Sequence, residues 1–79
     1  MKLNHSLKNK IKGSIIRFYA DLPRGLTFRS EEVLTYVKKD LNIQYIYPDT
    51  VFRYARELRK LGKINYICTN KRDRIIQVL

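Results

Sequence analysis

The sequence predicts an α+β domain in which three helices and one short strand precede a C-terminal β-hairpin. Three observations lead to this class. Apolar residues recur at every third or fourth position in three segments, which is the period of an amphipathic helix. Pro and Gly stand at the ends of these segments, where they start or stop helices. Residues 64–79 instead combine strand-forming residues with a central polar turn, which indicates a hairpin.

The first helix is expected from about Ser6 to Leu22. One stripe of apolar residues at helical spacing defines it: Leu7, Ile11, Ile15, Phe18 and Leu22. Gly13 costs a helix interior about 1 kcal/mol relative to Ala, which suggests that a close contact requires its small size. Pro23 and Gly25 then end the helix.

A second apolar edge of this helix has two alternative interpretations. Ile16 and Tyr19, extended by Leu3, lie beside the main stripe. They either cover the sheet that contains the hairpin, which we favour, or form the surface of a homodimer.

The second helix follows a short strand at Thr27–Arg29. We expect Ser30 to be its N-cap, with a hydroxyl that accepts a hydrogen bond from the first turn. Glu31 and Glu32 place negative charge in that turn, where it interacts favourably with the helix dipole. The helix is expected to run to about Leu41.

The third helix begins at Pro48, whose fixed φ suits the first helical position. The connector before it, Asn42–Tyr47, contains four apolar residues and is expected to be a turn held against the core. The inward stripe of the helix is Val51, Ala55, Leu58 and Leu61. Gly62 then ends the helix as a left-handed cap.

The hairpin is expected to comprise two strands, Ile64–Thr69 and Arg74–Leu79, joined by the polar turn Asn70–Asp73. A two-stranded hairpin is not stable alone, so it must pack on the helices, with Thr27–Arg29 as a third strand. Cys68 is the only cysteine, which excludes an internal disulfide and favours a small buried thiol in the strand.

Size and charge restrict the partner. A chain of 79 residues supports one modest core, so we expect a single domain over 1–79. The formal net charge is +10, with the basic residues concentrated in 1–25 and 50–79. Such a field attracts polyanions, and it exceeds what solubility alone requires.

The sequence contains no recognisable catalytic set. His5 and Cys68 stand alone and the glycines are isolated, so we expect no enzyme activity, metal, cofactor or small-molecule effector. No apolar run approaches the roughly 18 residues that span a bilayer, and we find no secretion signal. We therefore expect no membrane partner and a cytoplasmic or nucleoid-associated location.

The segment Pro48–Ile64 resembles the recognition helix and the start of the wing in winged-helix (winged helix-turn-helix) DNA-binding proteins. It has a Pro, a Thr-Val pair, the ending Arg-Glu-Leu-x-x-Leu-Gly and then an aliphatic residue. Phe28–Val33 resembles the short strand and second-helix start of that superfamily. The resemblance implies the order α-β-α-α-β-β, a recognition helix at about 48–61, a basic wing at about 63–79 and double-stranded DNA as the partner.

The expected contacts of the recognition helix lie opposite its inward stripe: Thr50, Arg53, Arg56 and Lys60. Arg53 is the best candidate for reading a base, because its guanidinium matches the O6 and N7 acceptors of guanine. Lys60, near the helix end, is better placed for a phosphate. The alternative is a solvent-exposed face with an Arg53–Glu57 ion pair.

The wing carries three basic residues around its turn: Lys71, Arg72 and Arg74. Wings lie along a phosphate backbone or reach into a minor groove, although a charged hairpin tip can also serve only to discourage edge pairing. Three lysines of the first helix are candidates for flanking phosphate contacts: Lys8, Lys10 and Lys12.

These features favour a sequence-specific or general double-stranded DNA-binding protein, such as a small transcriptional regulator that represses by occupancy. A homodimer would double the length of DNA read. One alternative is a winged-helix protein-interaction module. Another is RNA or single-strand binding, in which Tyr54 and Tyr66 would stack on unpaired bases.

Overall fold

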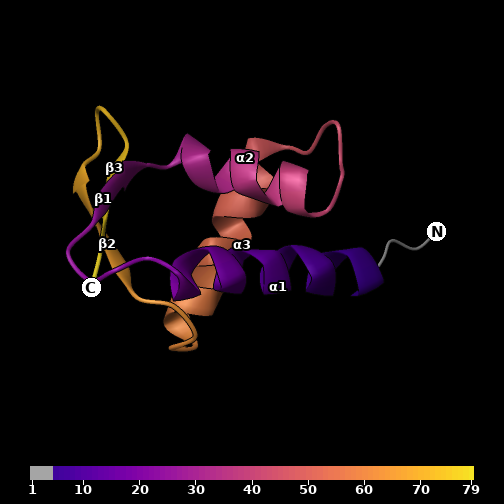
Figure 1. Cartoon of the computed structure of the whole chain (residues 1–79), viewed down its shortest axis with the longest axis horizontal. Coiled ribbons are helices and arrows are strands. Elements are labelled where there is room, and N and C mark those ends of the chain that lie inside the picture. Colours follow the sequence, from indigo (N-terminus) through magenta and orange to yellow (C-terminus); the bar gives the residue numbers. More distant parts are fainter. Residues whose placement is uncertain (1–4) are drawn as a thin grey trace.

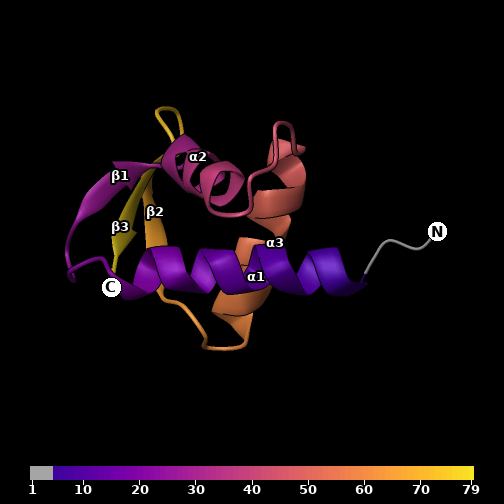
Figure 2. The same ribbon diagram turned by 45° about the vertical axis from the view of Figure 1, so that its right-hand side comes forward.

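The computed structural model describes residues 5–79 and confirms the predicted α+β layout. Its elements are α1 (His5–Ala20), β1 (Thr27–Arg29), α2 (Glu31–Asp40), α3 (Pro48–Lys60), β2 (Tyr66–Asn70) and β3 (Ile75–Val78). The sheet lies at one end of the three helices, and α1 crosses α3 (Figures 1 and 2).

The three strands form one antiparallel sheet in the order β1-β3-β2. Phe28 and Cys68 both pair with Ile76, so the short strand does complete the hairpin as expected. The turn begins one residue later than predicted, because Asn70 ends β2 and then binds the turn. Its Oδ1 accepts a hydrogen bond from the backbone N–H of Asp73 at 3.1 Å.

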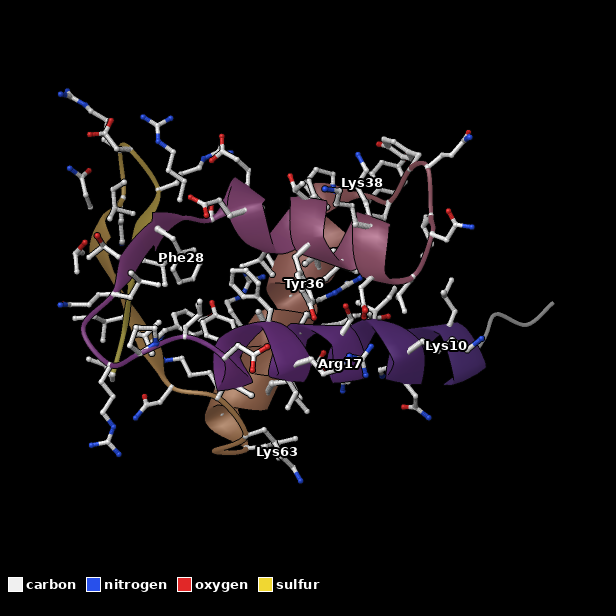
Figure 3. The ribbon with its side chains drawn as sticks, viewed as in Figure 1. Lys10, Arg17, Phe28, Tyr36, Lys38 and Lys63 are labelled. Carbon is white, nitrogen blue, oxygen red and sulfur yellow. The ribbon has the colours of Figure 1, made fainter. Side chains whose placement is uncertain are left out.

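The core is made by one stripe from each helix and the inner face of the sheet. Its buried residues are Ile11, Ile15, Tyr19, Phe28, Val33, Val37, Val51, Ala55, Leu58, Ile64, Tyr66 and Val78. Phe28 points inward from β1, and Tyr36 lies between α2 and α1 (Figure 3). The predicted stripes are therefore confirmed at their centres. They are wrong at their ends, because Leu7 and Leu61 are 38% and 67% exposed where their helices extend past the core.

Tyr19 joins the first helix to the sheet. Its ring stacks on Tyr66 of β2, with 5.4 Å between the ring centroids and 16° between the planes. Burial raises the pKa of Tyr19 well above its ordinary value. The second apolar edge of α1 therefore covers the sheet, and Tyr19 does not belong to an exposed dimer surface. Leu3, assigned to the same edge, lies outside the described residues.

The start of α2 differs from the prediction. Ser30 has helical dihedral angles and its hydroxyl makes no capping hydrogen bond. The carboxylate of Glu32 instead accepts from the backbone N–H of Arg29 at 3.3 Å. The backbone N–H of Ser30 donates to the carbonyl of Arg74 at 2.9 Å. Ser30 thus connects the start of α2 to the end of the hairpin turn, and Glu32 connects α2 back to the end of β1.

The end of α3 confirms the role expected for Gly62. Gly62 has φ of 77°, and the N–H of Lys63 donates to the carbonyl of Leu58 at 2.9 Å. The N–H of Gly62 donates to the carbonyl of Arg59 at 3.0 Å. These two bonds satisfy carbonyl groups that a helix end leaves free, in the arrangement that a left-handed residue makes possible.

Gly13, in contrast, has no structural need to be glycine. A Cβ at this position meets only the end of the Arg17 side chain, at 3.7 Å. The close contact expected from the sequence is therefore absent among the described residues.

We predict that Gly13→Ala raises the free energy of unfolding by about 0.5–1 kcal/mol, because it removes the helix penalty of glycine. The matched substitution Gly62→Ala should lower it by about 1 kcal/mol, because alanine is strained at positive φ. Urea unfolding followed by circular dichroism measures both. A destabilised Gly13→Ala protein would contradict this account of α1.

Candidate nucleic-acid interface

The third helix presents a basic face to solvent. Its buried stripe, Val51, Ala55 and Leu58, leaves the opposite side exposed. That side carries Arg53, Arg56 and Lys60, as the helical period predicts. Pro48 begins the helix and Asp49 lies in its first turn, also as expected.

A groove of about 580 Å³ separates this helix from the hairpin. Its walls carry four basic residues: Arg56, Arg59, Lys71 and Arg74. Asp49 is the one acidic residue of the lining, and part of the floor is apolar, with Phe52 and Ile76. We call this the basic groove. It brings together residues from two elements that are close only in the folded chain.

The hairpin turn contributes to the groove unequally. Lys71 and Arg74 line it, whereas Arg72 is exposed outside its lining. Arg74 has φ of 56°, and its carbonyl accepts the hydrogen bond from Ser30. The backbone at Arg74 is therefore held by α2, which positions the end of the turn beside Arg56 and Arg59.

Arg59 is a candidate site residue that was not among the residues predicted for the recognition helix. Its guanidinium lies 5.0 Å from the ring centroid of Tyr66. Burial raises the pKa of Tyr66, and the charges of Arg59 and Arg56 oppose that rise. The sequence does indicate that Arg59 lies on the same flank of α3 as Phe52. The side of the helix on which the hairpin packs is set only by the tertiary fold.

Cys68 also lines the basic groove, and its thiol is exposed. The expectation of a buried thiol is therefore wrong. Cys68 points to the same face of β2 as the buried Tyr66, two residues earlier. This face of β2 is covered at Tyr66, whereas at Cys68 it opens into the basic groove.

The three lysines of α1 predicted as phosphate contacts lie on different sides of the helix. Lys8 and Lys12 each lie 5.6 Å from the ring centroid of Tyr54 on α3. Lys10 falls on another side of the helix, near its N-terminal end and far from the hairpin (Figure 3). Lys8 and Lys12 thus adjoin the third helix, and Lys10 does not.

Glu57 pairs with α1 and not with its own helix. Its carboxylate lies 2.9 Å from Nζ of Lys12, so the Arg53–Glu57 pair of the alternative interpretation gives way to a pair between two helices. The ammonium of Lys12 lowers the pKa of Glu57. Arg53 remains exposed, with its guanidinium 6.0 Å from the ring centroid of Tyr54.

A second groove, of about 370 Å³, lies on the other flank of α3. Its lining residues come from α1, the connector and α3: Leu7, Lys8, Ile11, Ile43, Tyr45, Ile46, Tyr47, Thr50, Arg53 and Tyr54. We call this the aromatic groove. Three of the four expected recognition residues therefore divide between two grooves, with Thr50 and Arg53 on this side and Arg56 on the hairpin side, while Lys60 is exposed and lines neither.

The tyrosines named for single-strand binding are poorly placed for it. Tyr66 is 7% exposed and stacked on Tyr19, so it has no free face for a base. Tyr54 is half-buried beneath Lys8 and Lys12. The exposed aromatic rings are Tyr45 and Tyr47 in the connector.

A second ion pair holds α1 against α2. The guanidinium of Arg17 bonds to the carboxylate of Asp40. This contact raises the pKa of Arg17 and lowers that of Asp40. Arg17 is therefore engaged in an ion pair across two helices, while its side chain stays exposed.

Other kinds of site find little support in the part of the chain that the structure describes. Residues 5–79 contain no group of three or more His, Cys, Asp or Glu arranged to hold a metal ion. None of the described helices combines the length and apolarity needed to cross a bilayer. Comparisons with protein-family models, curated proteins and solved structures find no match to this chain.

We predict that the unfolding midpoint falls as pH drops from about 5 towards 3. The pKa values of Asp40 and Glu57 are lowered in the folded state from ordinary values of 3.8 and 4.5. Their stabilisation is therefore present above those values and is lost as pH falls through the lowered ones. Thermal unfolding of the wild type and of the double variant Asp40→Asn/Glu57→Gln, from about pH 5 to 3, measures this change in the midpoint. The double variant should show the weaker pH dependence, and an equal dependence would contradict the assignment.

Proposed function

We propose that the chain binds double-stranded DNA as a winged-helix protein, with α3 in the major groove and the hairpin as the wing. The basic groove carries this proposal, because four basic side chains and one acid line a concave surface between α3 and the hairpin. In helix-turn-helix proteins the recognition helix presents base-reading residues from its N-terminal part, while flanking groups bind phosphates. The exposed face of α3 matches that requirement in charge and position.

The side chains divide into two proposed roles. Arg53 and Arg56, exposed on the outward face of α3, would read base edges in the major groove. Lys60 would contact phosphate near the end of the helix. Lys71 and Arg74, on the opposite wall of the basic groove, would follow the adjacent backbone, with Arg72 reaching outward from the turn. Thr50 would bind either a base or a phosphate.

The number of basic side chains on the proposed surface determines the expected affinity for DNA and how that affinity depends on salt. The proposed surface offers five to seven cations, and about five simultaneous phosphate contacts would give a slope of log K against log salt near −5. Non-specific affinity would then be micromolar near physiological salt, and each base contact would add about 1–3 kcal/mol for a preferred site. A protein bound this way covers the DNA, so repression by occupancy is the regulatory role that we propose.

We predict that labelled random duplex DNA binds more tightly than single-stranded DNA or duplex RNA, with a steep salt slope. Fluorescence anisotropy over a salt series measures all three. Arg56→Ala/Arg74→Ala should weaken duplex binding at least tenfold and make the slope shallower by about one, because Arg74 is the phosphate contact of the two. The control Lys10→Ala/Lys39→Ala removes the same charge from exposed positions on α1 and α2, and should change affinity less than threefold.

If the groove variant and the control variant lose the same amount of duplex affinity, net charge and not the basic groove governs binding. Weak and equal binding to all three nucleic acids would contradict the proposal and favour a protein partner for the basic face.

Cys68 provides an independent reporter of the same surface. It is the only cysteine in the chain and it lines the basic groove with an exposed thiol. We predict that iodoacetamide alkylates it readily in the free protein and that duplex DNA slows this reaction several-fold. Mass spectrometry measures the rate. Protection should be lost in Arg56→Ala/Arg74→Ala, and an unchanged rate in saturating DNA would place the bound duplex elsewhere.

A further inference from the structure

Two neighbouring tyrosines in the connector between α2 and α3 are open to solvent. Tyr45 and Tyr47 are 66% and 68% exposed. Their rings meet edge to face, with 5.6 Å between centroids and 72° between planes. The connector and the hairpin lie on opposite sides of α2 (Figure 1), so these rings are separate from the basic groove.

The fold does not need these two rings for packing. The connector is anchored by Ile43 and Ile46, which are half-buried, and Ile46 packs on the core. The backbone carbonyl of Tyr47 accepts hydrogen bonds at the start of α3, a role that any residue can fill. Both tyrosine side chains thus remain available to a ligand.

The surroundings of the rings combine cations with apolar surface. Tyr45 and Tyr47 line the aromatic groove together with Lys8 and Arg53, and no acidic residue is among its lining residues. Exposed aromatic faces beside cations are suited to an unpaired base and its phosphate, since the ring stacks and the cation binds the charge. An acidic peptide could satisfy the cations but would leave the stacking faces without a planar partner.

Arg53 joins this groove to the proposed duplex-binding surface. It lies on the outward face of α3 and also lines the aromatic groove. A strand that separates from the duplex near the N-terminal end of α3 would therefore pass from Arg53 toward Lys8 and the two rings.

We propose that Tyr45 and Tyr47 form a stacking site for an unpaired nucleobase. The chain would then bind a duplex with a single-stranded extension more tightly than a blunt duplex. This inference rests on the proposed function for the duplex portion and adds a second, base-stacking contact to it.

Anisotropy titrations of one labelled duplex in three forms test the proposal: blunt, with a short thymidine overhang, and with an abasic overhang of equal phosphate number. The free single strand is a fourth probe. We expect the thymidine overhang to bind about fivefold or more tightly than the blunt form, and the abasic overhang to bind like the blunt form within about twofold. Overhangs of both polarities are compared, and the better one is used.

Substitutions separate stacking from charge. Tyr45→Ala/Tyr47→Ala should abolish the overhang advantage while leaving blunt-duplex affinity within about twofold. The control Tyr45→Phe/Tyr47→Phe keeps both rings and should retain the advantage. Circular dichroism confirms that each variant is folded.

The outcomes distinguish this inference from the proposed function. If blunt and extended duplexes bind equally, with a steep salt slope, the stacking site is wrong and duplex binding stands. If single strands bind in a tyrosine-dependent way and duplexes do not, stacking stands and the duplex proposal fails. If the abasic overhang binds as tightly as the thymidine overhang, the gain over the blunt duplex comes from the added phosphates, and the stacking site is wrong. Absence of binding to all four probes overturns both.

Discussion

The burial of one stripe of α3 is the constraint on which the rest of the structure depends. Val51, Ala55 and Leu58 lie inward against the other helices and the sheet, and each successive residue turns the helix by about 100°. This arrangement fixes Arg53 and Arg56 on the outward side. Turning the helix to bury either guanidinium would remove a charge from water without a partner, which is strongly unfavourable. The core thus determines the direction of the basic face.

The hairpin is held beside that face by contacts from two other elements. Tyr19 of α1 stacks on Tyr66 of β2, and the backbone of Ser30 bonds to the carbonyl of Arg74. The Lys12–Glu57 pair ties α1 to α3 and engages the carboxylate on the flank of α3 that faces α1. The carboxylate of Glu57 is thereby engaged with α1, which leaves Asp49 as the one acid that lines the basic groove.

Local patterns predicted the elements well, and non-local contacts account for what they missed. The period of apolar residues located each helix, and Pro48 and Gly62 marked the ends of α3 because their backbone preferences act locally. Arg59 could not be recognised, because its role depends on which flank of α3 the hairpin covers. The partner of Glu57 and the exposure of Cys68 depend likewise on how α1 and β2 extend relative to the core.

The most direct test of the central claim is a titration of the isotopically labelled protein with duplex DNA, followed through backbone amide chemical shifts. We expect the shift changes to concentrate on the outward side of α3 and on residues 71–74, with little change at Lys10 or Lys39. Changes centred on α1 and the outer side of α2, or their absence at saturating DNA, would contradict it.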